Sequence, residues 1–327
     1  MSYEIVIGGL DGATPLGFLA SLGALTVLSE RPGESDGGSP PRLSWRQLDT
    51  WRPVLHGDHS FEQIVDALWD DVVAWEDHPV LGFRYLKLEK RGSKPVGGLR
   101  APLAVLRAWL VARREAGDEG SLACSAALMC ETANELLEKD ADRDSPLDRV
   151  TLPTYFDFTS RNAQFLEQLG EIRSALSRDL IAAELETGKP DPAAPRSMDW
   201  DPMADTPGAI YTGYTRGFLP VSEWLAFRGL VHFPVTGDGA TLRTTACTGR
   251  RKSGTFVWPL WNRPASAGAV GSLVAYPGLE ELSATARQAL GIVSVLRAGL
   301  VKKADGYSGM FSPAEPVQPP ATIPRSA

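Results

Sequence analysis

Apolar and polar positions in the first thirty residues predict a strand followed by a helix. Residues 3–10 form a short apolar run rich in β-branched residues, which is typical of a buried strand. Thr14 and Pro15 have the residue types of a helix N-cap and a first helical position. Residues 16–29 are apolar almost all round, so we expect a buried helix there. Two glycines inside this segment predict close packing against another backbone.

The same reasoning predicts elements along the rest of the chain. Residues 60–75 place apolar residues at helical spacing behind a serine N-cap, which predicts an amphipathic helix. Further helices are expected over 99–116, 121–138, 160–186 and 279–303. Strands are expected over 43–48, 51–55, 81–88 and 151–158, and in the runs 230–235, 241–247 and 255–261.

The predicted fold class is α+β. It has a helix-rich N-terminal part with a short buried N-terminal strand, and a smaller β-rich C-terminal part closed by a helix. The expected organisation is a helix-rich domain with a basic loop and helix over 1–186, a proline-rich linker or crossing loop over 187–208, a β-rich α+β part over 209–303 and a disordered proline-rich tail over 304–327.

Composition narrows the class of protein. Apolar residues make up 43% and charged residues 22% of the chain, which is ordinary globular usage and excludes a disordered or fibrous protein. No run of 18 apolar residues occurs and the N-terminus lacks a signal-peptide pattern, so we expect no membrane contact. The three cysteines show no metal-ligand spacing, which favours the reducing cytoplasm.

Basic residues are concentrated in one stretch although the protein is acidic. The net charge of the chain is -7. Residues 84–114 contain nine basic residues and one acidic residue, so this stretch carries +8 and the remainder -15. We expect a flexible loop over 89–98, which suits contact with a repetitive phosphate backbone. On the helix predicted after it, Arg100, Arg107 and Arg114 are spaced by seven and fall along one face.

A second basic stretch lies between two predicted strands. Residues 249–254 form a turn with three adjacent cations, and no acidic residue occurs over 239–279. The candidate nucleic-acid-binding residues of the two stretches are therefore Lys87, Lys90, Arg91, Lys94, Arg100, Arg107, Arg114, Arg250, Arg251 and Lys252. Each stretch also has an alternative interpretation. The first would be a solvated basic helix face, and the second would be an exposed turn whose charges keep it soluble.

Catalytic signatures are missing from the sequence. It contains no phosphate-binding loop, no dinucleotide fingerprint and no nucleophile elbow. Residues 56–59 (HGDH) lack helical metal-ligand spacing and are expected to form a polar turn before a helix. Tryptophans such as Trp258 and Trp261 follow the second basic stretch, where they could stack on bases, but we expect them to fill the core. The sequence thus predicts a protein that is not an enzyme and has no cofactor or metal.

Several motifs resemble one protein family. Residues 9–25 (GLDGATPLGFLASLGAL) are similar to the N-terminal opening of CRISPR-associated proteins of subtype I-G (formerly I-U). Residues 200–202 (WDP) with Asp205, 225–230 (LAFRGL) with 233–234 (FP), and 256–261 (FVWPLW) extend the similarity. Together they resemble an accessory group of those loci, near the helicase-extension and Cascade large-subunit families. The resemblance covers both ends of the chain and brings no catalytic residues with it.

The first functional hypothesis combines this resemblance with the basic stretches. It is a non-catalytic component of a CRISPR antiviral system that binds nucleic-acid backbone within or beside a type I effector complex. Its expected partners are other CRISPR-associated proteins of the same locus, and crRNA or target DNA. The alternative is a protein-interaction adaptor that links effector complex and nuclease without touching nucleic acid. A third hypothesis is a small-molecule enzyme with its site beside residues 11–15.

Overall fold

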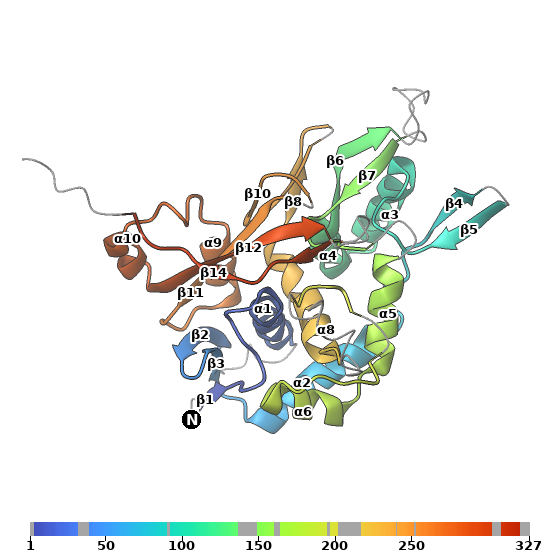
Figure 1. The fold of residues 1–327 in the computed structure, drawn as a ribbon. Coiled ribbons are helices and arrows are strands. Elements are labelled where there is room, and N and C mark those ends of the chain that lie inside the picture. The colour runs from blue at the N-terminus through green and yellow to red at the C-terminus, as the bar shows by residue number, and fades with distance from the viewer. Residues whose placement is uncertain are drawn as a thin grey trace, which may run out of the picture.

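Helix α1 (Pro15–Ser29) lies in the middle of the molecule (Figure 1). Thr14 caps it, since its hydroxyl oxygen accepts a hydrogen bond from the backbone nitrogen of Gly17 at 3.0 Å. Residues 15–28 are all buried, which confirms the predicted buried helix and its cap. The structure is a computed structural model that describes residues 3–31, 39–89, 92–136, 149–159, 164–194, 197–201, 217–239, 241–251, 253–302 and 309–320.

Helix α8 (Pro220–Gly229) crosses α1 where each helix has a glycine. A Cβ atom on Gly23 would lie 1.7 Å from the carbonyl oxygen of Leu225, and one on Gly229 would lie 2.3 Å from the carbonyl oxygen of Leu19. No side chain fits at either distance, so the backbones meet directly. This confirms the close packing that the helical glycines predict.

Helix α8 ends in a short 3-10 turn, η3 (Leu230–His232). The strand predicted over 230–235 is therefore wrong except at its last residue, where β8 begins. Leu230 and Phe233 in this run are buried, and a short apolar run of this kind has the same pattern in a helix and in a buried strand.

A three-stranded antiparallel sheet in the order β1-β3-β2 lies beside α1. Its strands are β1 (Tyr3–Val6), β2 (Arg42–Gln47) and β3 (Trp51–Gly57), which confirms the strands predicted over 43–48 and 51–55. The strand predicted over 3–10 ends at Val6, and its predicted burial is wrong, because its first two residues are exposed and its last two are half-buried at the edge of the sheet. Helix α2 (Phe61–Ala74) follows, and Ser60 with Gln63 forms its capping box. The predicted amphipathic helix is thus confirmed as well.

The middle of the chain contains more strand than its sequence predicts. It consists of β4 (Tyr85–Glu89), β5 (Gly92–Val96), α3 (Leu103–Glu115), α4 (Glu119–Leu128), β6 (Met129–Leu136) and β7 (Arg149–Pro153). The helix predicted over 121–138 is wrong in its second half, because Met129 is extended (φ -160, ψ 159) and begins β6. The helix predicted over 160–186 is interrupted, and its described part is α5 (Phe165–Ala175) and α6 (Arg178–Thr187), with Ser177 capping the second.

The C-terminal part of the chain builds a second antiparallel sheet in the order β10-β11-β12-β13, with β14 also paired to β12. These strands are β10 (Cys247–Thr248), β11 (Thr255–Trp261), β12 (Ile292–Lys302), β13 (Gly309–Phe311) and β14 (Glu315–Pro316). Strands β8 (Val235–Gly237) and β9 (Leu242–Thr244) form a hairpin, and the helices are α9 (Ala267–Val274) and α10 (Ala284–Ala289). The mixture of helices and antiparallel sheets agrees with the predicted α+β class.

The helix predicted to close this part over 279–303 is wrong. Only α10 is helical there, and Gly291 (φ 73) separates it from the eleven-residue strand β12. The disordered tail predicted over 304–327 is wrong for residues 309–316, since β13 and β14 pair with β12 and Phe311 is fully buried. Residues 304–308 and 321–327 lie outside the described residues.

Core side chains from both sides of the proline-rich stretch 187–208 form one buried cluster. Phe18 of α1 stacks on Trp45 at 5.7 Å between ring centroids and contacts the ring of Trp258 at 5.8 Å. The indole nitrogen of Trp258 donates to the carbonyl oxygen of Gly12 at 3.0 Å. The tryptophans of β11 therefore fill the core as expected, and the proline-rich stretch does not separate two hydrophobic cores.

Candidate nucleic-acid interface

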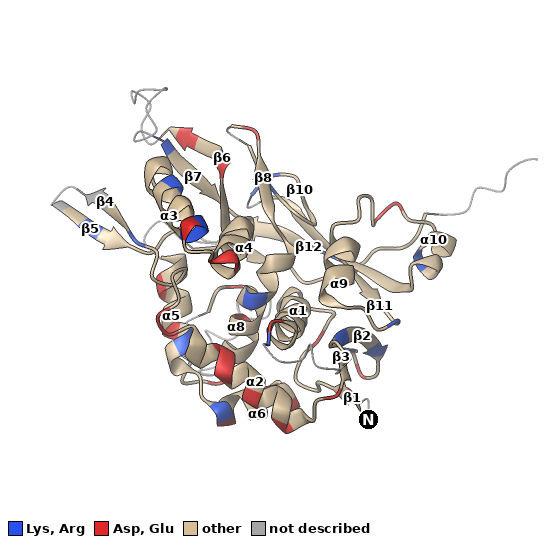
Figure 2. Ribbon diagram, turned by 180° about the vertical axis from the view of Figure 1, so that it is seen from behind, with Lys and Arg blue, Asp and Glu red and all other residues tan. Residues whose placement is uncertain are grey.

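The β4–β5 hairpin projects from the body of the molecule (Figures 1 and 2). Its antiparallel register places position 87 directly opposite position 94, and both positions are lysines in the sequence. Positions 86 and 95 pair on the other face. The flexible loop predicted over 89–98 is therefore wrong for residues 92–96, which are strand, and Lys90 and Arg91 lie outside the described residues.

The base of the hairpin is held against α5. The backbone nitrogen of Gly97 donates to Glu167 Oε1 at 3.1 Å, and the carbonyl oxygen of Gly97 accepts from Leu166 N at 2.9 Å. A Cβ atom on Gly98 would lie 3.0 Å from the hydroxyl oxygen of Tyr85. Burial raises the pKa of Tyr85 to about 12, so its hydroxyl stays neutral at the root of the ribbon.

The arginine stripe predicted over 100–114 is mostly used within the chain. Helix α3 begins only at Leu103, because Pro102 occupies its N-cap position, so Arg100 precedes the helix. Arg100 pairs with Glu135, and Arg107 Nε lies 2.7 Å from Glu131 Oε2.

Both acidic partners of these arginines lie on β6, the strand that the sequence does not predict. Arg114 is the member of the stripe that is exposed with no ion-pair partner in the described part of the chain. The structure therefore does not give the three arginines a common free face.

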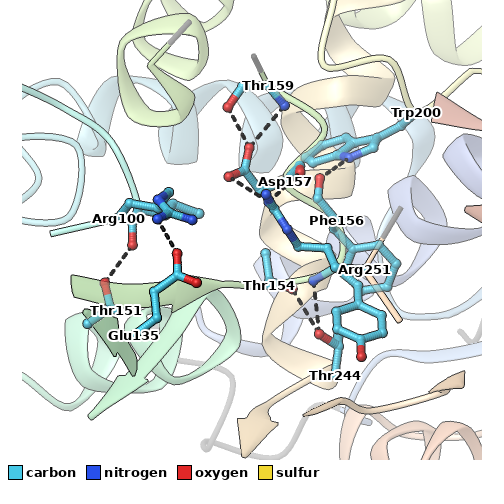
Figure 3. A network of polar contacts seen from close by, with 12 residues as sticks. Arg100, Glu135, Thr151, Thr154, Phe156, Asp157, Thr159, Trp200, Thr244 and Arg251 are labelled. Carbon is cyan, nitrogen blue, oxygen red and sulfur yellow. Dashed lines mark hydrogen bonds and ion pairs between the residues drawn. The ribbon is translucent and has the colours of Figure 1, made fainter. Parts of the chain in front are cut away.

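The second basic stretch forms a hairpin tip between β10 and β11, as predicted. Arg250 is exposed there and has no ion-pair partner among the described residues, whereas Lys252 lies outside them. Arg251 instead turns toward the body of the protein. Its Nη1 donates to the carbonyl oxygen of Asp157 at 3.1 Å and lies 3.4 Å from Asp157 Oδ2 (Figure 3).

Asp157 follows β7 and is held in place by its own turn. Its Oδ1 accepts from the backbone nitrogen of Thr159 at 3.0 Å and from the Thr159 hydroxyl (Figure 3). A buried hydrogen bond holds the preceding residue, because Trp200 Nε1 donates to the carbonyl oxygen of Phe156 at 2.9 Å. Arg251 thus anchors the tip to a buried carboxylate, which sequence spacing did not reveal because the two residues lie 94 positions apart.

Charge is distributed unevenly over the molecule (Figure 2). Acidic residues gather on α2 and α6, and Arg178 at the start of α6 is paired there with Glu62 and Asp66. The β4–β5 hairpin lies away from these helices, beyond α5 (Figure 2). A polyanion is therefore disfavoured at the α2–α6 edge by like charge.

The motifs that carry the family resemblance are mainly structural here. Gly229 of the LAFRGL motif is the crossing point of α8 with α1, and Trp200, Trp258 and Trp261 are buried. Arg228 of the same motif is 7% exposed and lies 4.6 Å from the ring centroid of Trp75. Its Nε lies 3.1 Å from Asp71 Oδ1, and a second ion pair joins it to Glu30.

Two buried carboxylates at the first turn of α8 escaped the sequence analysis. Glu184 of α6 accepts from the backbone nitrogens of Val221 and Ser222 at 3.1 and 2.7 Å, so it caps α8 from another helix. Glu223 accepts from Met198 N at 3.0 Å, and its Oε2 has no hydrogen-bond partner among the described residues. Burial raises the pKa of Glu184 to about 7 and that of Glu223 to about 8.

The other polar segments singled out in the sequence have local roles. His56 Nε2 lies 2.8 Å from the Ser44 hydroxyl, and no group of His, Cys, Asp or Glu able to hold a metal ion occurs among the described residues. At the start of α1, Asp11 Oδ1 accepts from Ala13 N at 2.8 Å and from the Thr50 hydroxyl at 2.6 Å. Residues 11–15 are thus engaged in a turn and a helix cap.

Comparison with known proteins gives no match: no family model fits the sequence, and no curated protein or solved structure shows significant similarity to the chain. Within the described ranges, no helix is long and apolar enough to cross a membrane.

Proposed function

We propose that this protein is a non-catalytic component of a CRISPR antiviral system that contacts nucleic-acid backbone through the β4–β5 hairpin. The observation that carries the proposal is the paired position of Lys87 and Lys94 on a two-stranded ribbon that projects from the body. The motif resemblance supports the CRISPR context, and the expected partners are other proteins of the same locus with crRNA or target DNA.

The hairpin has the physical properties of a phosphate-contacting element. An isolated two-stranded ribbon gains little stability from its own pairing, so a projecting one is best explained by a partner that it contacts. Two cations at opposite positions of a ribbon can both be contacted by anions that lie along it. A phosphate backbone supplies such anions at regular spacing and releases counterions when lysines neutralise it.

The contact set is smaller than the ten cations that the sequence suggested. Arg100, Arg107 and Arg251 have carboxylate partners within the chain, and each would have to give up that partner to bind phosphate. The proposed set is Lys87 and Lys94 at paired positions of the hairpin, extended by Lys90 and Arg91, which lie between them in the sequence. Arg250 at the β10–β11 tip is the second candidate contact.

A protein-interaction adaptor is the second candidate function, and one observation favours it. Leu86 is 64% exposed on the hairpin face opposite the lysines, where it pairs with Pro95. A protein partner would bury this apolar side chain, which favours association. In this alternative the lysines would dock on an acidic protein surface, and no nucleic acid would bind.

Fluorescence anisotropy with labelled single-stranded RNA, single-stranded DNA and duplex DNA tests the proposal. The test variant is Lys87→Ala/Lys94→Ala, and the matched control is Arg42→Ala/Lys189→Ala, which removes two exposed cations from β2 and from the end of α6. We expect wild type and control to bind at least one ligand and the hairpin variant to bind it about ten-fold more weakly or worse. Equal binding by both variants would contradict the hairpin assignment, and no binding at low salt would favour the adaptor.

A further inference from the structure

A pocket of about 380 Å³ lies between α10 and the start of β12, far along the chain from the β4–β5 hairpin. Its volume lies in the range of pockets that bind small molecules. Of the residues that the structure describes, two arginines and two amides line it and no carboxylate does, which gives it a positive lining. The polar and principal apolar lining residues are Asn262, Arg263, Arg287, Gln288, Ile292 and Pro319.

The first observation about this pocket is a buried arginine without a counterion. Arg287 is 7% exposed, and its guanidinium donates to the carbonyl oxygens of Leu282, Val317 and Glu280 at 3.2, 2.7 and 3.3 Å. No carboxylate pairs with it in the part of the chain that the structure describes, and the carboxylate of Glu280 pairs instead with Arg297 at 3.6 Å. Carbonyl oxygens satisfy three of its N–H groups but leave the positive charge unneutralised, and buried charges are normally paired.

The second observation is a positioned arginine at the mouth of the same pocket. The side chain of Arg263 lies over Gly291, because a Cβ atom there would be 3.2 Å from Arg263 Cδ. Gly291 also has φ 73, which glycine adopts without strain. Packing against Gly291 fixes the aliphatic part of the Arg263 side chain. Its guanidinium has no hydrogen-bond or ion-pair partner within the described residues, so its N–H groups are available to a ligand.

We propose that this pocket binds an oxyanion, specifically a phosphate group, between Arg263 and Arg287. A phosphate accepts several hydrogen bonds at once, and guanidinium groups bind it in a two-pronged geometry. The amides of Asn262 and Gln288 add donors, and Ile292 with Pro319 offers an apolar wall to the rest of the ligand. The phosphate is carried either by a small molecule or by the end of a nucleic-acid strand.

This site is independent of the proposed hairpin contact. Its lining residues are distinct from those of the hairpin, and its two arginines are not in the set assigned to backbone contact. Binding of phosphate here would therefore survive the loss of Lys87 and Lys94, and the two proposals can fail separately.

Isothermal titration calorimetry of the full chain tests the proposal with four ligands. They are inorganic phosphate, a nucleoside monophosphate, and one short oligonucleotide with and without a 5′-phosphate. We expect saturable binding of at least one phosphate ligand and about ten-fold or more weaker binding by Arg263→Ala. Tighter binding of the mononucleotide indicates a small-molecule ligand, and a preference for the phosphorylated oligonucleotide over its unphosphorylated form indicates a strand end.

Two further variants make the test decisive. Gln288→Glu, on the exposed face of α10, places a carboxylate at the pocket and should abolish phosphate binding without removing a buried contact. Arg42→Ala removes an exposed cation from β2 and should leave binding unchanged. The proposal is overturned if no phosphate ligand binds saturably to the wild type, or if Arg263→Ala and Gln288→Glu bind as well as Arg42→Ala.

Discussion

Gly23 of α1 and Gly229 of α8 lie against each other at the centre of the molecule. A Cβ atom on Gly229 would lie 2.9 Å from the backbone nitrogen of Gly23. The crossing joins the N-terminal helix to a helix that follows the proline-rich stretch, so it ties the two parts of the chain into one core. Both glycines occur in motifs that carry the family resemblance, which therefore reflects how the chain packs.

Substitution at this crossing should destabilise the fold. We expect Gly229→Ala to lower the free energy of unfolding by about 1–3 kcal/mol or more, because the methyl group would overlap backbone atoms of α1 that cannot move aside. The matched control is Gly170→Ala in the middle of α5, where no atom lies within 4 Å of the added Cβ. That control should raise stability by about 0.5–1 kcal/mol through helix propensity. Urea titration followed by tryptophan fluorescence measures both, and equal effects would refute the close-packing argument.

The buried ion pair of Arg228 supplies a second prediction about stability. Arg228→Ala should cost about 3–5 kcal/mol, because it leaves Asp71 buried without its cation. Burial raises the pKa of Asp71, and the guanidinium acts against that rise. As a control, Arg31→Ala removes the exposed pair with Asp70 and should cost about 1 kcal/mol or less. If chemical denaturation gives similar losses for both variants, Arg228 does not have the structural role assigned to it.

Stability should fall as the pH rises through neutrality. Glu184 and Glu223 have pKa values of about 7 and about 8 in the folded protein, above the usual 4.5 that applies once the chain unfolds. The folded state therefore holds protons that the unfolded state releases. The resulting stabilisation is complete below about pH 4.5 and is lost as the pH passes through 7 and 8.

Thermal unfolding from about pH 6 to about pH 9 checks this dependence. Glu223→Gln keeps the shape of the neutral acid and cannot ionise, so its Tm should decline less steeply with pH than that of the wild type. A matched control is Glu186→Gln on the exposed part of α6. The account is contradicted if Glu223→Gln and Glu186→Gln both retain the wild-type dependence.

Local signals in the sequence predicted the elements that local interactions determine. The cap at Thr14, the buried α1 and the N-cap at Ser60 depend on neighbouring residues, and all three were predicted. Strand β12 was not, since its apolar residues also fit a helical pattern and its state depends on pairing with β11 and β13. Such pairing is a long-range interaction, which spacing along the chain does not encode.

The candidate site shows the same limit. The sequence predicted two basic stretches at the surface, and Lys94 and Arg250 are indeed exposed. It did not show that Arg107 is paired with Glu131, because that contact requires β6 to lie beside α3. The unpaired charge of Arg287 was likewise invisible, since an arginine near the end of a short helix has an ordinary explanation until its burial is known.

The salt dependence of nucleic-acid affinity tests the central claim most directly. Anisotropy titrations of wild type, Lys87→Ala/Lys94→Ala and the Arg42→Ala/Lys189→Ala control, at several concentrations from about 50 to about 200 mM salt, give the number of phosphates neutralised. We predict that the logarithm of affinity falls linearly with the logarithm of salt, and that the hairpin variant loses about 1.4–1.8 from this slope, corresponding to two phosphate contacts. A slope unchanged in the hairpin variant, or lowered equally in the control, would contradict nucleic-acid binding through the β4–β5 hairpin.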